Sequence, residues 1–149
     1  MVWAWQALGE HLGFASTAPD NLWAPRAARQ AVVELKTGCT TDTIAKKDMD
    51  RLGGSVRWLN DHNPAGEALP VMLHPSWVSD DKATAVPGMR VVTPATFGKL
   101  REAVTSYAAA LASNPIRWAD EQAVREQLAH HKLTADRFFT TYAEAVRAS

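Results

Sequence analysis

The residues best suited to chemistry are an acid and a lysine two positions apart, Glu34 and Lys36. They follow the short apolar segment 31–33, whose valines favour an extended strand. Side chains alternate between the two faces of a strand, so Glu34 and Lys36 are expected on one face. Val33 and Leu35 are expected on the opposite face, toward a core. The ordinary alternative is a solvent-facing strand whose ion pair contributes little to stability.

A second carboxylate, Asp20, precedes this strand at a Pro19-Asp20 turn. A hairpin can bring Asp20 beside Glu34, and two adjacent carboxylates repel each other unless a cation lies between them. Carboxylate oxygens suit Mg²⁺ or Mn²⁺. A lysine beside such an ion, here Lys36, would hold or deprotonate a water, or offset charge on phosphorus. These are the parts needed for metal-assisted hydrolysis of a phosphodiester.

Elements that position these residues are indicated by hydrophobic periodicity and turn residues. Helices are expected at 2–12, at 42–60 with Thr40 or Thr41 as the N-cap, and at 93–113 with Thr96 as the N-cap. Further helices are expected at 119–131 and 134–148. Strands are expected at 13–17, 21–25, 31–35, 69–75 and 89–94. Strands interspersed with helices, beginning with a hairpin, predict a mixed α/β sandwich.

The "PD" at 19–20 and the "ELK" at 34–36 resemble the motif of the PD-(D/E)XK nuclease superfamily. This resemblance implies a restriction-endonuclease-like α/β core, a mixed central sheet flanked by helices in the order αβββαββα, with extra C-terminal helices. The expected element order agrees with that core over residues 1–111. We therefore expect a nuclease core at 1–113 and a helical extension packed on it at 114–149.

The resemblance also implies an activity, metal-dependent hydrolysis of DNA. Asp20, Glu34 and Lys36 would be the catalytic residues. The Mg²⁺ (or Mn²⁺) ligands would be Asp20, Glu34, the carbonyl of Leu35 and, from the first helix, Glu10. Restriction, phage defence or DNA processing in a prokaryote is the implied context.

The segment 37–59 is similar to the helix that follows the Glu-x-Lys strand in several prokaryotic members, where it lends polar groups to DNA. On this helix and its flanks, the residues expected to bind nucleic acid are Lys46, Lys47, Arg51 and Arg57. Many relatives carry a glutamine there, whereas this chain has Asp50 and Arg51. The adjacent Gly53 and Gly54 are costly within a helix. They indicate a close backbone approach, either to a sheet or to a phosphate backbone.

Composition sets limits on these interpretations. The 149 residues include 16 basic and 16 acidic side chains, so any nucleic-acid surface would be a local patch. The single cysteine, Cys39, excludes an internal disulfide and fits a reducing compartment, so we expect a cytoplasmic protein. No apolar run approaches the ~20 residues of a membrane span.

DNA is the expected partner. A helicase/ATPase, another defence-system subunit or a fused domain is a further expectation, as is a homodimer that could cut two strands. The rival interpretations are a non-catalytic nucleic-acid-binding or scaffolding domain of the same fold, and an RNA nuclease using the same site, because a fold does not fix a function.

Other residues favour plainer roles. His74 follows an apolar strand and is expected to be packed and hydrogen-bonded. Cys39 belongs to no Cys-His sequence pattern, which argues against a catalytic thiol. Trp77 could stack on a base, although packing is the plainer role for a tryptophan. The aromatic cluster Phe138, Phe139 and Tyr142 suggests packing over the core or, alternatively, a docking surface.

Overall fold

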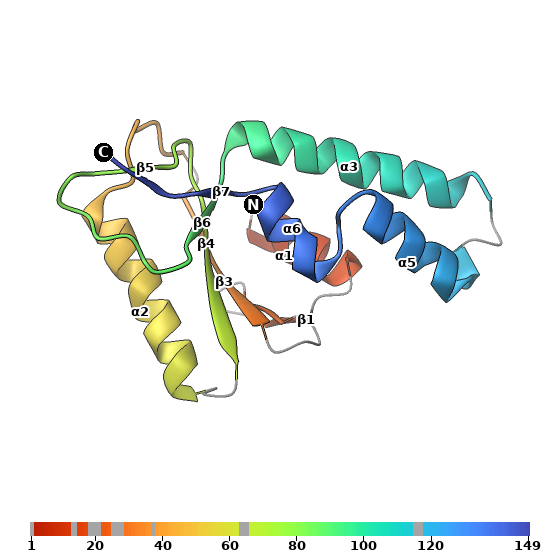
Figure 1. Ribbon diagram of the computed structural model, residues 1–149, viewed down its shortest axis with the longest axis horizontal. Helices are drawn as coiled ribbons and strands as arrows, with labels where there is room; N and C mark the ends of the chain where they lie inside the picture. The colour runs from red at the N-terminus through yellow and green to blue at the C-terminus, as the bar shows by residue number, and fades with distance from the viewer. Residues whose placement is uncertain are drawn as a thin grey trace. The chain divides into compact units, whose positions relative to one another are not determined.

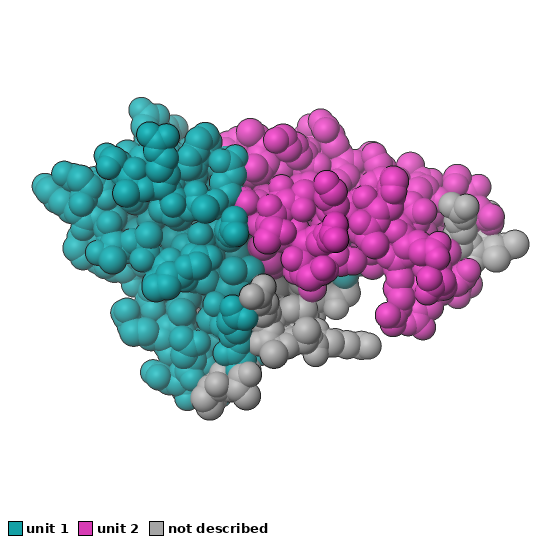
Figure 2. Space-filling model, viewed as in Figure 1, with its two compact units in different colours: residues 1–93, 144–149 teal, residues 94–143 magenta. Residues whose placement is uncertain are grey.

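The computed structural model describes residues 2–12, 15–17, 22–24, 29–36, 38–62, 66–114 and 118–149. Asp20 lies outside these ranges, so its predicted position beside Glu34 stays a prediction. The chain forms two compact units, shown in different colours in Figure 2. Unit 1 comprises residues Met1–Thr93 and Glu144–Ser149, and unit 2 comprises Pro94–Ala143.

Within the described part of unit 1, six strands form one mixed sheet in the order β1-β2-β3-β4-β6-β7. Their bounds are β1 Ala15–Thr17, β2 Leu22–Ala24, β3 Arg29–Leu35, β4 Glu67–Leu73, β6 Arg90–Val92 and β7 Glu144–Ala145. The first three strands form an antiparallel meander. β3, β4 and β6 run parallel, and β7 closes the row in the antiparallel direction. This confirms the predicted mixed α/β class with a mixed sheet flanked by helices.

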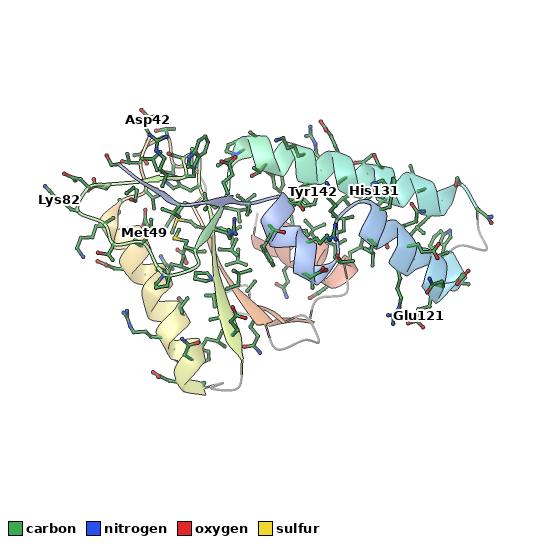
Figure 3. The ribbon with its side chains drawn as sticks, viewed as in Figure 1. Asp42, Met49, Lys82, Glu121, His131 and Tyr142 are labelled. Atoms are coloured by element: carbon green, nitrogen blue, oxygen red, sulfur yellow. The ribbon has the colours of Figure 1, made fainter. Side chains whose placement is uncertain are left out.

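A helical crossover, α2 (Lys46–His62), joins the parallel strands β3 and β4 (Figure 1). Parallel neighbours need such a crossover because their ends lie at opposite edges of the sheet. The buried face of α2 carries Met49, Leu52 and Leu59. These residues pack with Val32 of β3 and Met72 of β4 in one hydrophobic cluster, and Figure 3 labels Met49 on the side of α2 nearer the sheet. The shorter helix α1 (Val2–His11) contacts β1.

The helix α2 begins at Lys46, four residues later than expected, and the predicted cap at Thr40 or Thr41 is wrong. The reason is that Ile44 is held in extended backbone. Its N–H donates to the carbonyl of Val78 (2.8 Å), and its carbonyl accepts from Asp80 (3.0 Å). Ile44 also forms a parallel bridge with Ser79 of β5 (Val78–Ser79). Pairing with β5 therefore outweighs the local capping signal.

Unit 2 is helical, with α3 at Pro94–Ala112, α5 at Glu121–His130 and α6 at Ala135–Thr141. Phe138 and Phe139 are buried and meet edge to face, and Phe138 meets Tyr142 in the same way, which confirms the predicted aromatic cluster. The Tyr142 hydroxyl donates to the carbonyl of His131, and the two residues lie together in Figure 3.

Two details of the helical prediction are wrong. Thr96 is buried inside α3 and is not its cap, because the helix begins at Pro94, and proline suits a first helical turn. The last predicted helix ends at Thr141. The residues after it form β7, which pairs with β6, and β8 (Arg147–Ala148), which pairs with β5. Backbone pairing with the edges of β5 and β6 thus outweighs the helical propensity of the segment "AEAVRA".

The expected boundary lies after residue 113, whereas the second compact unit spans Pro94–Ala143. The helix α3 therefore belongs to the same unit as the C-terminal helices, and Glu144–Ser149 belongs to the unit that contains the sheet. The extent of the domains stays a prediction. Among the described helices, none combines the length and apolar character that crossing a membrane requires.

Candidate functional site

Glu34 and Lys36 meet where β3 ends. The Lys36 ammonium lies 3.2 Å from Glu34 Oε1, which confirms that the two side chains share a face of the strand. Both are largely covered, with 16% of the Glu34 side chain and 19% of the Lys36 side chain exposed. On the opposite face Val33 is buried, as predicted, whereas Leu35 is only half-buried. The pair is therefore not the solvated strand edge of the ordinary alternative.

The sheet fixes the backbone at this point. Glu34 is in register with Met72, and Leu35 with Leu73, of the parallel strand β4. The ladder continues one residue further, because the Lys36 N–H donates to the carbonyl of Leu73 at 3.0 Å. Lys36 thus begins a loop at the carboxyl edge of parallel strands, the edge at which open α/β sheets bind ligands.

The crossover helix adds a second carboxylate that the sequence did not single out. Asp48, in the first turn of α2, places Oδ1 2.8 Å from the Lys36 ammonium. The side chain is 12% exposed, so this is a largely buried charge. An acidic residue in the first turn of the helix after the Glu-x-Lys strand is the signal that could have found it, since carboxylates are favoured there.

Arg51, one turn further along α2, approaches the other side of the pair. Its Nε lies 3.3 Å from Glu34 Oε1, the oxygen that also contacts Lys36. The Arg51 side chain is 68% exposed, so most of the guanidinium group remains in solvent. The described residues therefore form a group of alternating charges, Asp48, Lys36, Glu34 and Arg51, which we call the β3–α2 charge cluster.

The cluster keeps Lys36 cationic. Partial burial by itself lowers the pKa of the ammonium, but the hydrogen bonds and charges of Asp48 and then Glu34 outweigh it. The net result is a Lys36 pKa above its ordinary value. At neutral pH the side chain is therefore a fixed positive charge and hydrogen-bond donor. This charge state suits orienting a water or stabilising an anionic transition state, and it disfavours a role as general base.

The other predicted metal ligands are not brought together by the described residues. Glu10 is exposed on α1, where its Oε1 accepts a hydrogen bond from the Gln6 amide at 3.3 Å. Asp20 lies outside the described residues. In the described ranges no group of three or more His, Cys, Asp or Glu side chains could hold a metal. Glu34 by itself still suits Mg²⁺, which takes one or two protein carboxylates and fills its other positions with waters and phosphate oxygens.

The predicted nucleic-acid-binding residues lie on the exposed surface of α2. Lys46 pairs with Asp50 at 2.7 Å, and both side chains are 60% exposed. Lys47 and Arg57 are exposed as well, and Arg51 is engaged with Glu34. All four residues are accessible from solvent, and their binding to nucleic acid stays a prediction.

The expected close approach of a sheet to the paired glycines is wrong, and the alternative, approach of a phosphate backbone, stays a prediction. A side chain at Gly53 would meet only the Arg57 guanidinium and Val86 Cγ2, both at 3.6 Å, which is ordinary contact. At Gly54 the nearest atom is again from Arg57, at 4.0 Å. The neighbours are side chains, so no polypeptide backbone among the described residues requires glycine there.

A thiol and an imidazole meet beside the cluster. His74, directly after β4, is 3% exposed and its Nδ1 accepts from the Ser76 N–H at 3.0 Å, which confirms the packed, hydrogen-bonded histidine. Its Nε2 lies 3.4 Å from Cys39 Sγ, and Thr41 Oγ1 lies 3.0 Å from the same sulfur. The hydrogen bond from Thr41 is the main reason that the pKa of the Cys39 thiol falls below its ordinary value. The sequence lacks a Cys-His pattern, and the sheet supplies one in space.

The loops after β3 and β4 also enclose a shallow pocket of about 230 Å³. Its lining residues are Thr40, Thr41, Asp42, Pro75, Ser76, Trp77 and Val78. The Trp77 side chain is partly exposed there, at 38%, as an aromatic surface on this side of the sheet. Base stacking by Trp77 stays a prediction.

Comparison with known proteins does not identify a family for this chain. The sequence matches no family model, and it has no significant match among curated proteins or solved structures.

Proposed function

We propose that this chain is a metal-dependent nuclease domain of the PD-(D/E)XK type that hydrolyses DNA phosphodiester bonds. The observation that carries the proposal is the contact of Glu34 with Lys36 at the carboxyl end of β3. An acid and a lysine fixed side by side at that edge are the pair that the Glu-x-Lys motif requires. Their low exposure and the raised pKa of Lys36 distinguish them from a solvated surface pair.

The order of elements supports the same proposal. A helix, an antiparallel meander, a crossover helix and further parallel strands follow one another in unit 1. This is the order that the resemblance implies for the restriction-endonuclease-like core, with the motif on the third strand. The helix α3 then follows β6, as the last element of that core does.

Each residue of the site has a proposed role. Glu34 and Asp20, with the Leu35 carbonyl and Glu10, would hold Mg²⁺ or Mn²⁺. Such an ion, when bound, polarises the phosphoryl oxygen and lowers the pKa of a bound water. Lys36 orients the attacking water by hydrogen bonding and offsets negative charge that develops on the phosphate oxygens.

The substrate class and context rest on the resemblance. DNA would approach along α2, where Lys46, Lys47, Arg51 and Arg57 are exposed to contact phosphates. The proposed context is a module in prokaryotic restriction, phage defence or DNA processing. A helicase/ATPase or another defence subunit, fused or separate, is the proposed partner, and a homodimer the form for cutting two strands.

A cleavage assay tests the proposal. Supercoiled, linear and single-stranded DNA and a single-stranded RNA are incubated with the protein in Mg²⁺, Mn²⁺ or EDTA. Wild type should cut DNA only with a metal, and Glu34→Gln and Lys36→Ala should each lose at least ~100-fold in kcat. Glu121→Gln, which breaks an exposed ion pair with Arg125 in unit 2, is the matched control and should cut normally. Equal activity in wild type, Glu34→Gln and Lys36→Ala would refute the site.

A non-catalytic nucleic-acid-binding or scaffolding domain is the second candidate. It is favoured by the pairing within the β3–α2 charge cluster, where each cation already contacts a carboxylate. Such a network can be structural only. Wild type would then bind labelled DNA in a fluorescence anisotropy titration yet release no product with either metal, and Lys36→Ala would change stability but not binding.

A further inference from the structure

Lys36 is held from two directions, by a strand and by a helix. Its ammonium contacts Glu34 Oε1 within β3 at 3.2 Å and Asp48 Oδ1 of α2 at 2.8 Å. The shorter contact is the one to Asp48. Glu34, the first partner of the lysine, belongs to the predicted motif. Asp48, the second and closer partner, has no role in that motif.

Asp48 is unusual for its burial. Asp48 is the one buried carboxylate among the described residues, with 8% of the residue exposed. The other buried polar residues there are His74, Ser79, Thr93 and Thr96. A buried carboxylate is costly unless it is paired and hydrogen-bonded. The first turn of α2 offers a favourable helix dipole, and Lys36 offers a direct counter-charge. The position is thus one in which an aspartate is stabilised chiefly by the lysine it faces.

The two carboxylates have different tasks if Glu34 acts in hydrolysis. Glu34 also contacts Arg51 and would bind a metal through its oxygens. The carboxylate of Glu34 therefore interacts with several positive charges, of which Lys36 is only one. Asp48 comes from another element and would keep the lysine in place while Glu34 is occupied. A lysine side chain has four rotatable bonds and large rotamer freedom, so a second anchor limits where its ammonium can go.

We propose that Asp48 is the positioning residue of the site: it fixes the Lys36 ammonium beside Glu34, where the ammonium can donate a hydrogen bond to the attacking water. This inference rests on the proposed nuclease function. Asp48 touches neither substrate nor metal in this arrangement, and it acts through Lys36.

Asp48→Asn tests the proposal, because it keeps the shape of the side chain and removes its charge. We expect kcat for DNA cleavage to fall by at least ~10-fold with KM changed less than ~3-fold, since binding of DNA does not use Asp48. Asp61→Asn, which removes an exposed carboxylate near the end of α2, should match wild type in both kcat and KM.

A second measurement does not depend on cleavage. NMR relaxation of protein carrying ¹³C-labelled lysine, with Lys36 assigned from Lys36→Arg, reports the mobility of this side chain directly. The Lys36 side chain should be more mobile in Asp48→Asn than in wild type and unchanged in Asp61→Asn. If wild type cuts no nucleic acid, the proposed function fails, and this measurement still decides whether Asp48 holds Lys36 in place. An unchanged mobility of Lys36 in Asp48→Asn would overturn the inference.

Asp48→Glu separates positioning from folding. It retains the charge but moves the carboxylate by one methylene, so thermal unfolding should stay close to wild type. Misplacing the lysine should still lower kcat by ~10-fold, because small displacements of a positioning group are costly in rate. A variant that folds and cuts like wild type would show that Asp48 is a structural ion-pair partner only.

Discussion

The thiol of Cys39 and the imidazole of His74 lie 3.4 Å apart, although 35 positions separate them in the sequence. Lys36 and His74 follow the parallel strands β3 and β4 directly, so the two loops that start there meet. In a neutral imidazole one ring nitrogen donates and the other accepts. When Nδ1 accepts from the Ser76 N–H (3.0 Å), Nε2 carries the proton that faces Cys39; when Nδ1 donates to the Ser76 carbonyl (2.9 Å), Nε2 is the acceptor for the thiol. In the first of these tautomers a Cys39 thiolate has the Nε2–H of His74 as a neighbouring donor, and Thr41 Oγ1 lies 3.0 Å from the same sulfur.

Cys39 should react faster than a free thiol at neutral pH. Its pKa is lowered mainly by the Thr41 hydrogen bond, and the thiolate is the reactive form. The rate of iodoacetamide labelling, followed by mass spectrometry against pH, should have its midpoint below the ~8.5 of a free cysteine. Since this is the one cysteine of the sequence, each labelled molecule reports this site.

Thr41→Val should raise the midpoint of that labelling curve, because it removes the main donor to the sulfur. Thr40→Val is the matched control, being the adjacent exposed threonine of the same pocket. Identical curves for Thr41→Val and wild type would contradict the assigned cause.

Removing the Lys36 charge should destabilise the fold. In Lys36→Met, Asp48 would remain buried without its counter-charge, and losing one partner of a buried ion pair costs ~3 kcal/mol. Lys46→Met breaks an exposed pair with Asp50 and should cost no more than ~0.5 kcal/mol. Urea unfolding followed by circular dichroism measures both.

The double variant Lys36→Met with Asp48→Asn should recover part of the lost free energy of unfolding, since it leaves no unpaired charge. If Lys36→Met proves as mild as Lys46→Met, the Lys36–Asp48 pair contributes little to stability and its effect on the site would be local.

Stability should also fall at alkaline pH in a way that depends on Lys36. A folded-state pKa above the unfolded value gives stabilisation that is complete below the unfolded pKa and is lost as the pH rises through the folded pKa. For lysine this window begins at pH ~10.4. Burial raises the pKa values of Tyr107 and Tyr142 as well, so their ionisation also lowers the free energy of unfolding as the pH rises.

Comparison with Lys36→Met isolates the lysine contribution. The difference in the free energy of unfolding between wild type and this variant should shrink as the pH rises past ~10.4, because the tyrosines titrate equally in both proteins. A difference that stays constant up to pH ~11.5 would mean that the Lys36 pKa is not coupled to folding.

Local patterns were sufficient where the backbone itself sets the geometry. Period-two alternation placed Glu34 and Lys36 on one face of β3, and they are in contact. Alternation also placed Val33 in the core, where it is buried. The apolar runs that became β4 and β6 were recognisable for a different reason, because buried parallel strands are nearly continuous in hydrophobic residues.

The parts that could not be predicted depend on contacts between distant segments. Asp48 enters the site because α2 starts at Lys46, and that start is set by the pairing of Ile44 with β5. Cys39 meets His74 because β3 and β4 are parallel neighbours. The terminal strands β7 and β8 form on the edges of β6 and β5, although their own sequence favours a helix. In each case tertiary pairing outweighs local propensity.

Packing within unit 2 should depend on Phe138. This side chain has 0% exposure and contacts both Phe139 and Tyr142, so Phe138→Ala should cost ~3–5 kcal/mol through lost burial and a residual cavity. Trp118→Ala, which truncates a large aromatic side chain that is 68% exposed, should stay within ~0.5 kcal/mol. Thermal unfolding of both variants tests this, and equal losses would mean that the aromatic cluster does not stabilise this unit.

If α2 faces a phosphate backbone, its exposed cations should govern the salt dependence of DNA binding. Each lysine that neutralises a phosphate releases a counterion, so Lys47→Ala should reduce the slope of log K against log salt by about one. Arg57→Ala should act in the same way, whereas Lys46 is partly neutralised by Asp50 and should contribute less. Fluorescence anisotropy at several salt concentrations, in Ca²⁺ or EDTA to limit cleavage, gives these slopes. Lys99→Ala, an exposed lysine of α3 in the other unit, should leave the slope unchanged, and a loss equal to that of Lys47→Ala would point to diffuse attraction instead of a surface on α2.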